Sequence, residues 1–167
     1  AVEIIEAVRK AVGEDFAIVF RFSQWKQQDY SAQLAQTPEQ LTEFLTLLSD
    51  AGVDVFHAST RRFWSPEFEG STLNLAGWTK KITGKPVITV GSVGLDSDFV
   101  GEGNDDLKGG SNTASIDSLL ERLNNDEFDL VAIGRALLVD PLWVSKIRDD
   151  KTDELESFSK EALMKLS

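Results

Sequence analysis

Short apolar runs alternate with amphipathic helical patterns along this chain of 167 residues, and this alternation constrains the fold more than any other feature. Four of the runs are rich in β-branched and aromatic residues, which is typical of strands buried on both faces. Strands that alternate with helices pair in parallel through right-handed crossovers. The sequence therefore predicts an α/β fold with strands at residues 16–23, 53–59, 86–91 and 130–134.

Helix signals lie between these runs. Gly13 stands where a first helix would stop, and Thr37 followed by Pro38 forms a helix start. Asp140 followed by Pro141 forms a second start of the same kind. We expect helices over residues 2–12, 38–51 and 115–125, a short one before the third strand, one opening at Pro141, and a C-terminal amphipathic helix within 151–167.

Two architectures accommodate this order of elements: an open doubly wound sheet, or part of a (β/α)8 barrel. A complete barrel needs about 200 residues or more, and four βα units are half of one. We therefore expect residues 1–150 to form a half-barrel of four parallel strands. Residues 101–112 are rich in glycine, aspartate and asparagine and lack periodicity, so we expect a mobile surface insertion there.

Composition argues against several classes of protein. The chain has 28 acidic and 17 basic residues and a net charge of -11, which disfavours binding to nucleic acid. It has no cysteine and one histidine, so we expect no disulfide, no zinc ribbon and no metal site. No apolar run approaches the roughly 20 residues of a membrane span. The N-terminus reads as a helix rather than a signal peptide, and we expect a cytoplasmic protein without membrane contact.

Arg21 is the first candidate for a functional side chain. In the alternation of a strand it shares one face with Ala17 and Val19, whose small size suits the interior of a barrel. It would then lie near the carboxyl end of the strand, where such barrels bind ligands. Because a buried arginine is costly unless it is paired, an internal ion pair with Asp54 is the structural alternative.

Glycine turns follow the third and fourth strands. Residues 90–94, VGSVG, place Gly91 and Ser92 at the end of one strand, and Gly134 and Arg135 follow the next. Such turns let the backbone approach an anion closely, and a helix that opens after the turn favours phosphate. Each turn alone is a weak signal, but their position after consecutive strands predicts a phosphate site.

The motifs together resemble the C-terminal half of the Old Yellow Enzyme family of NADH:flavin oxidoreductases. The matching stretches are Arg21-Phe22-Ser23, residues 51–54 (AGVD), residues 90–94 and residues 128–137 (FDLVAIGRAL) with Asp140-Pro141 behind them. The resemblance spans about residues 1 to 150. It implies an FMN-dependent TIM barrel that takes hydride from NAD(P)H and reduces activated alkenes or similar acceptors, the ene-reductase reaction.

The resemblance also implies roles for five residues. Arg21 matches an arginine that contacts the flavin ring near N1 and O2, and would tune its electronics. Gly91, Ser92, Gly134 and Arg135 match the residues that hold the FMN phosphate. The family's substrate-anchoring pair (a His with an Asn or a second His), its usual Tyr proton donor and the residue near flavin N5 lie in its N-terminal half, which this chain lacks. We therefore expect the catalytic groups to lie elsewhere and the chain alone to be inactive.

Other side chains are candidates with simpler alternatives. His57 ends the second strand and could face the mouth of the site, or be a structural histidine. Tyr30 could approach a substrate from its loop, and the adjacent Arg61 and Arg62 could attract a dinucleotide phosphate or be solvated. The aromatic residues in the same loops could line a pocket or pack the loops against the barrel: Trp25, Phe63, Trp64 and Phe68.

Two other functions fit the same residues without flavin. One is an α/β module that binds a phosphorylated ligand without redox chemistry, and the other is an FMN-free barrel isomerase or lyase. The colour of bound oxidised flavin would distinguish these from an oxidoreductase. Because a half-barrel leaves two strand edges open, we also expect self-association.

Overall fold

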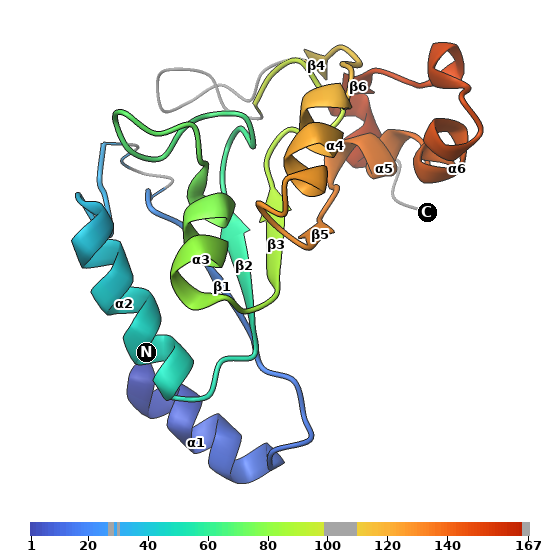
Figure 1. Ribbon diagram of the computed structural model, residues 1–167. Coiled ribbons are helices and arrows are strands. Elements are labelled where there is room, and N and C mark those ends of the chain that lie inside the picture. Colours follow the sequence, from blue (N-terminus) through green and yellow to red (C-terminus); the bar gives the residue numbers. More distant parts are fainter. Residues whose placement is uncertain (27–28, 30, 99–109, 165–167) are drawn as a thin grey trace.

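A parallel sheet forms the centre of the molecule (Figure 1). The structure, a computed structural model, describes residues 1–26, 29, 31–98 and 110–164. The sheet has the strand order β1-β2-β3-β5, and every neighbouring pair is parallel. Its strands are β1 (Val19–Phe22), β2 (Val55–Ser59), β3 (Val87–Val90) and β5 (Leu130–Val131). All four lie inside the predicted runs, so the predicted α/β class is confirmed.

The helices between the strands begin and end largely where the sequence predicts. Thr37 caps the second helix, because its hydroxyl accepts a hydrogen bond from the Gln40 N–H at 3.3 Å. Asn74 caps the third in the same way, through the Gly77 N–H at 2.8 Å. The helices are α1 (Val2–Val12), α2 (Pro38–Asp50), α3 (Leu75–Thr83) and α4 (Asp117–Asn124).

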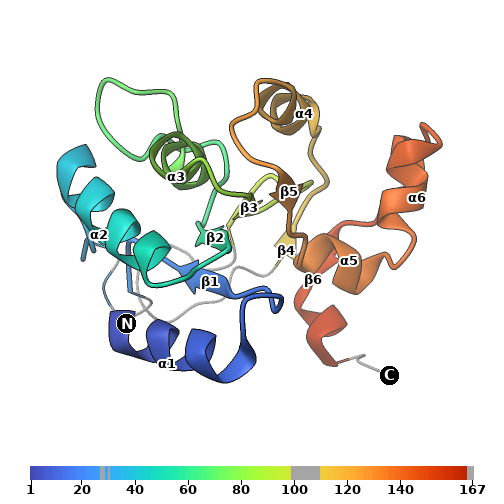
Figure 2. The same ribbon diagram turned by 60° about the horizontal axis from the view of Figure 1, so that its bottom comes forward.

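The two faces of the sheet have different surroundings. Helices α2, α3 and α4 lie along the outer side of the curved row of strands (Figure 2). The side chains toward these helices form the core, and among them Phe22, Phe56 and Val87 are buried. On the other face the register pairs Val19 with Val55 and Arg21 with His57, and these side chains are partly or fully exposed. In the described part of the chain, helices thus cover one side of the sheet, as one expects of half of a barrel.

The C-terminal part differs from the predicted amphipathic helix over 151–167. It contains the short 3-10 helices η1 (Thr152–Glu154) and η2 (Lys160–Met164) with a strand β6 (Phe158–Ser159) between them. Strand β6 pairs antiparallel with β4 (Gly110–Ser111). Buried Phe158, which lies under the Arg135 guanidinium, holds this segment extended. The predicted helix is therefore wrong for the described residues 151–164.

Two smaller predictions also need correction. Helix α6 (Trp143–Arg148) begins two residues beyond Pro141, although the Asp140 carboxylate accepts from the Leu142 N–H as a capping residue does and also pairs with Lys146. Of the insertion predicted at 101–112, residues 101–109 lie outside the described residues, whereas residues 110–111 are strand β4. A five-residue helix, α5 (Arg135–Val139), precedes α6. Among the helices that the structure describes, none has the length and apolar character to cross a membrane.

Candidate functional site

A cavity of about 270 Å³ lies at the carboxyl ends of β3 and β5. It brings together the four residues predicted to hold a phosphate: Gly91, Ser92, Gly134 and Arg135. Parallel strands end at the same edge of a sheet, so the two glycine turns meet there although 43 residues separate Ser92 from Arg135.

Gly91 is required by the close approach of two loops. Its φ of +148° is one that side-chain-bearing residues rarely adopt. A Cβ at this position would lie 2.6 Å from the Thr60 hydroxyl and 2.9 Å from the main-chain N of Phe63. The Phe63 N–H donates to the Gly91 carbonyl at 3.1 Å, so the two loops are hydrogen bonded at their closest point. This glycine therefore shapes the floor of the cavity.

Ser92 and Arg135 connect the two turns directly. Arg135 Nη2 donates to Ser92 Oγ at 2.9 Å, and the same hydroxyl donates to the Arg61 carbonyl at 2.9 Å. Ser92 has a φ of +51°, in the left-handed region that non-glycine residues adopt only when their surroundings require it. The contact with Arg135 is part of those surroundings.

Arg135 is held from several sides. Its guanidinium also donates to Ser111 Oγ at 2.8 Å and to the Ser97 carbonyl at 2.6 Å, and it lies 5.4 Å from the Phe158 ring centre. Burial lowers the pKa of Arg135, and the carboxylates of Asp98 and Asp96 oppose that change. The side chain is thus a fixed cation at the wall of the cavity. Since α5 has only five residues, this cation rather than a helix dipole dominates the local field.

Gly134 has no steric reason to be a glycine within the protein. A Cβ there would meet no atom within 4 Å, and the residue lines the cavity. In the described part of the chain, the N–H groups of Gly91, Ser92 and Gly134 donate to no main-chain carbonyl. Main-chain donors beside a fixed guanidinium are the groups that bind a phosphate.

Asp98 is a site residue that sequence reasoning did not find. Its side chain is 2% exposed and pairs with both Arg61 and Arg62. Arg61 and Asp98 line the cavity together. The Arg61–Arg62 pair is therefore not simply solvated: a buried carboxylate fixes both guanidinium groups beside the cavity. Spacing alone gives no signal for this contact, because 36 residues separate Asp98 from Arg62.

Arg21 and His57 meet on the open face of the sheet. Arg21 Nη1 lies 2.6 Å from His57 Nε2, and Arg21 Nη2 donates to Ser59 Oγ at 2.9 Å. Desolvation, with a smaller contribution from Arg21, lowers the pKa of His57, so the neutral imidazole is favoured. The alternative pairing of Arg21 with Asp54 is wrong, since Asp54 forms an ion pair with Arg9 of helix α1.

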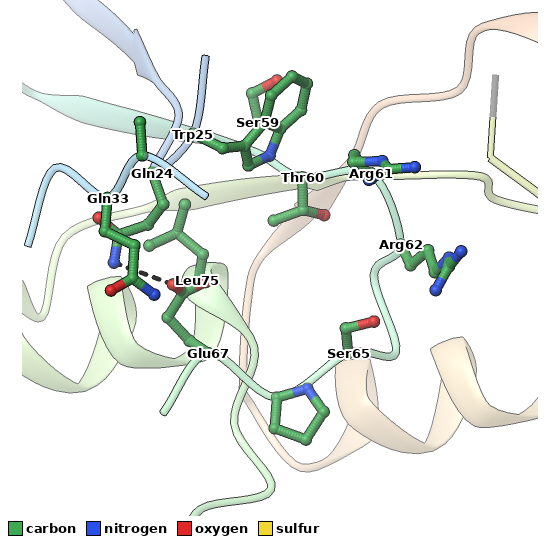
Figure 3. Close-up of a pocket in the computed structure, with 12 residues that line it drawn as sticks. Gln24, Trp25, Gln33, Ser59, Thr60, Arg61, Arg62, Ser65, Glu67 and Leu75 are labelled. Atoms are coloured by element: carbon green, nitrogen blue, oxygen red, sulfur yellow. Dashed lines mark hydrogen bonds between the residues drawn. The ribbon is translucent and has the colours of Figure 1, made fainter. Parts of the chain in front are cut away.

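A second cavity of about 230 Å³ lies beside the first, between the loop after β1 and the loop after β2 (Figure 3). Gln24, which is buried, donates to Glu67 Oε1 at 2.9 Å. Burial raises the pKa of Glu67, and the Gln24 hydrogen bond opposes this only in part. The two cavities share the side chains that separate them: Trp25, Ser59, Thr60 and Arg61.

The aromatic loop residues divide between the two roles considered for them. Phe63 and Phe68 are buried and pack the loop, Phe63 edge-on to Trp64 with ring centres 5.2 Å apart. Trp25 instead lines both cavities. Tyr30 lies outside the described residues.

The sequence of the chain is similar to parts of two longer proteins. No family model matches the chain. It is 30% identical over 161 residues to an NADH oxidase of Thermoanaerobacter brockii, covering 92% of this chain and 21% of that protein. It is 27% identical over 167 residues to a bilirubin reductase of Clostridium symbiosum, covering 93% of this chain and 39% of that protein. The chain thus spans well under half the length of these relatives.

Two solved structures share the fold at low sequence identity. An old yellow enzyme homologue from Zymomonas mobilis superposes with a TM-score of 0.63 and 12% identity, covering 96% of this chain and 38% of that one. A morphinone reductase in complex with tetrahydroNAD gives a TM-score of 0.62 and 14% identity, covering 96% and 36%. The predicted resemblance to the Old Yellow Enzyme family is confirmed, and so is the predicted partial barrel.

Proposed function

We propose that this chain is the C-terminal half-barrel of a cytoplasmic, FMN-dependent NAD(P)H oxidoreductase of the ene-reductase type. The observation that carries the proposal is the cavity at the ends of β3 and β5, where Ser92 and Arg135 are hydrogen bonded at 2.9 Å between two glycine turns. The similarity to an NADH oxidase and the fold shared with a morphinone reductase support the redox assignment.

The residues of the cavity fit the phosphate group of FMN. Arg135 lines the cavity, and a planar guanidinium matches the oxygens of a phosphate. The space above Gly134, which a Cβ would enter, leaves room for a phosphate oxygen to reach the main chain. Asp98 would repel a phosphate, and its pairing with Arg61 and Arg62 offsets that charge.

Arg21 would contact the ring system rather than the phosphate. Its guanidinium lies on the open face of the sheet and is oriented by His57 and Ser59. A fixed positive charge there favours added negative charge on a neighbouring ring. Bound FMN would supply the two-electron chemistry that couples NAD(P)H to an acceptor such as an activated alkene. The residues of this chain would hold and orient FMN. The groups that anchor the acceptor belong to the rest of the proposed barrel.

Titration with FMN tests the proposal. The full-length protein should bind FMN with the visible absorbance of oxidised flavin, and NADH should bleach that absorbance. A colourless protein that binds inorganic phosphate or a sugar phosphate at this cavity would replace the proposal with a binding module or an isomerase. The chain alone should show no NAD(P)H oxidation with FMN and cyclohexenone. Turnover equal to that of the full-length protein would contradict the location of the acceptor site.

A further inference from the structure

The second cavity has two chemically different ends (Figure 3). Glu67, Gln33 and Leu75 lie at one end, and the paired arginines Arg61 and Arg62 lie at the other. The indole of Trp25 lines the cavity as well. A ligand that fits both ends carries a hydrogen-bond donor on a flat group and an anionic group some distance away.

Glu67 can accept more hydrogen bonds than the described residues give it. Within the described residues its carboxylate accepts one side-chain hydrogen bond, from Gln24, whose amide is otherwise occupied by the main chain of Ala35. Desolvation raises the pKa of Glu67, which means that its charged form is poorly solvated where it stands. A bound N–H donor would supply the missing hydrogen bond, and none of the roles proposed above uses this carboxyl group.

Two arginines form the other end of the cavity. Both pair with the carboxylate of Asp98. The side chain of Arg62 is 40% exposed and lies 3.3 Å from that carboxylate, so it has donors left for an anion. The hydroxyl of Ser65 lines the cavity on the way to this end.

We propose that the second cavity binds the adenylate end of NAD(P)H, with the adenine amino group at Glu67 and a phosphate at Arg62. This inference rests on the proposed function, which supplies the dinucleotide. The volume of about 230 Å³ lies below the roughly 300–1,000 Å³ of sites that enclose a whole ligand, and it suits one end of a longer molecule. The shared wall of Trp25, Ser59 and Arg61 places that end beside the cavity assigned to FMN.

The experiment compares ADP with IDP by calorimetry in the full-length, FMN-loaded protein. Adenine presents an amino group where hypoxanthine presents a carbonyl oxygen, so the wild-type protein should bind ADP about tenfold more tightly than IDP. Glu67→Gln leaves one oxygen for Gln24 and turns an amide N–H₂ toward the ligand, which should abolish or reverse the preference. Glu69→Gln, an exposed neighbour, is the matched control and should leave it unchanged.

Two further ligands, adenosine and inorganic pyrophosphate, test whether the arginine end binds a phosphate. Adenosine, which has no phosphate, should bind at least tenfold more weakly than ADP, and Arg62→Ala should weaken ADP but not adenosine. Equal binding of ADP and IDP by the wild-type protein, or inorganic pyrophosphate competing as well as ADP, would overturn the inference. The flavin absorbance reports FMN independently: a protein that holds FMN but not ADP refutes this inference alone, and a protein that holds no FMN refutes the proposed function.

Discussion

The guanidinium of Arg21 and the imidazole of His57 lie side by side, with 2.6 Å between Nη1 and Nε2, because parallel β1 and β2 place the two residues in direct register. A guanidinium has no acceptor, so the imidazole nitrogen that accepts must be unprotonated. The only histidine of the chain thus orients the arginine proposed to face the flavin ring.

Acidification should destabilise this contact. The pKa of His57 is lowered in the folded protein, first by desolvation and then by Arg21, so the unfolded chain binds the proton more tightly. Stability is therefore retained above the unfolded pKa of about 6.5 and lost as the pH falls through it. Urea unfolding should show this loss between about pH 7.5 and 5.5 in the wild-type protein. His57→Gln should flatten the profile in that window; an unchanged slope would contradict the lowered pKa.

Arg21→Lys should change the flavin more than the fold. Lysine keeps the charge but loses the planar fork that reaches His57 and Ser59 together. We expect a lower flavin reduction potential and slower reduction by NAD(P)H in the full-length protein. Redox titration and stopped-flow absorbance measure both. A variant with wild-type potential and rate would show that Arg21 serves structure only.

Arg135→Ala should weaken FMN retention by about 1.5–3 kcal/mol, the scale of a charged hydrogen bond. The matched control is Ser111→Ala, which removes one of the contacts that hold Arg135 but keeps its guanidinium and its bond to Ser92. The control should lose much less affinity in an FMN titration. Equal losses in both variants would mean that Arg135 acts by holding the loops together.

The two glycines of the cavity should respond differently to alanine. Gly91→Ala should destabilise the protein by about 1–3 kcal/mol, because the new Cβ would meet Thr60 and the main chain of Phe63 in a backbone conformation that alanine avoids. Gly134→Ala should leave the unfolding free energy nearly unchanged, since its Cβ points into open space, and should weaken FMN binding. Denaturation and FMN titration of both variants separate the two effects. Unaltered FMN affinity in Gly134→Ala would remove this residue from the phosphate site.

Local signals in the sequence were sufficient for the strands, the capped helices and the glycine turns. The roles of Thr37 and Gly91 can be predicted from the sequence, because a cap or a tight turn depends on one or two neighbouring residues. The role of Asp98 cannot be predicted in this way, since its burial depends on arginines 36 residues or more away in the chain. The predicted tail helix is wrong because the tail also depends on contacts with distant residues. Phe158 has helical spacing, but the pairing of β6 with β4 and the contact with Arg135 hold it extended.

We predict that the chain self-associates through the edges and the exposed face of its four-stranded sheet. The edge strands β1 and β5 each expose a large apolar side chain, Val19 at 53% and Leu130 at 56%. Exposed parallel edges pair readily with another chain, and a two-fold arrangement would cover both edges and the open face. In its described residues the tail forms a short strand and 3-10 turns, not an amphipathic helix that could fold over that face. Light scattering should therefore give a mass above that of the monomer at micromolar concentration, and Val19→Lys with Leu130→Lys should lower it. A monomeric mass up to millimolar concentration would show that the open face is tolerated in water.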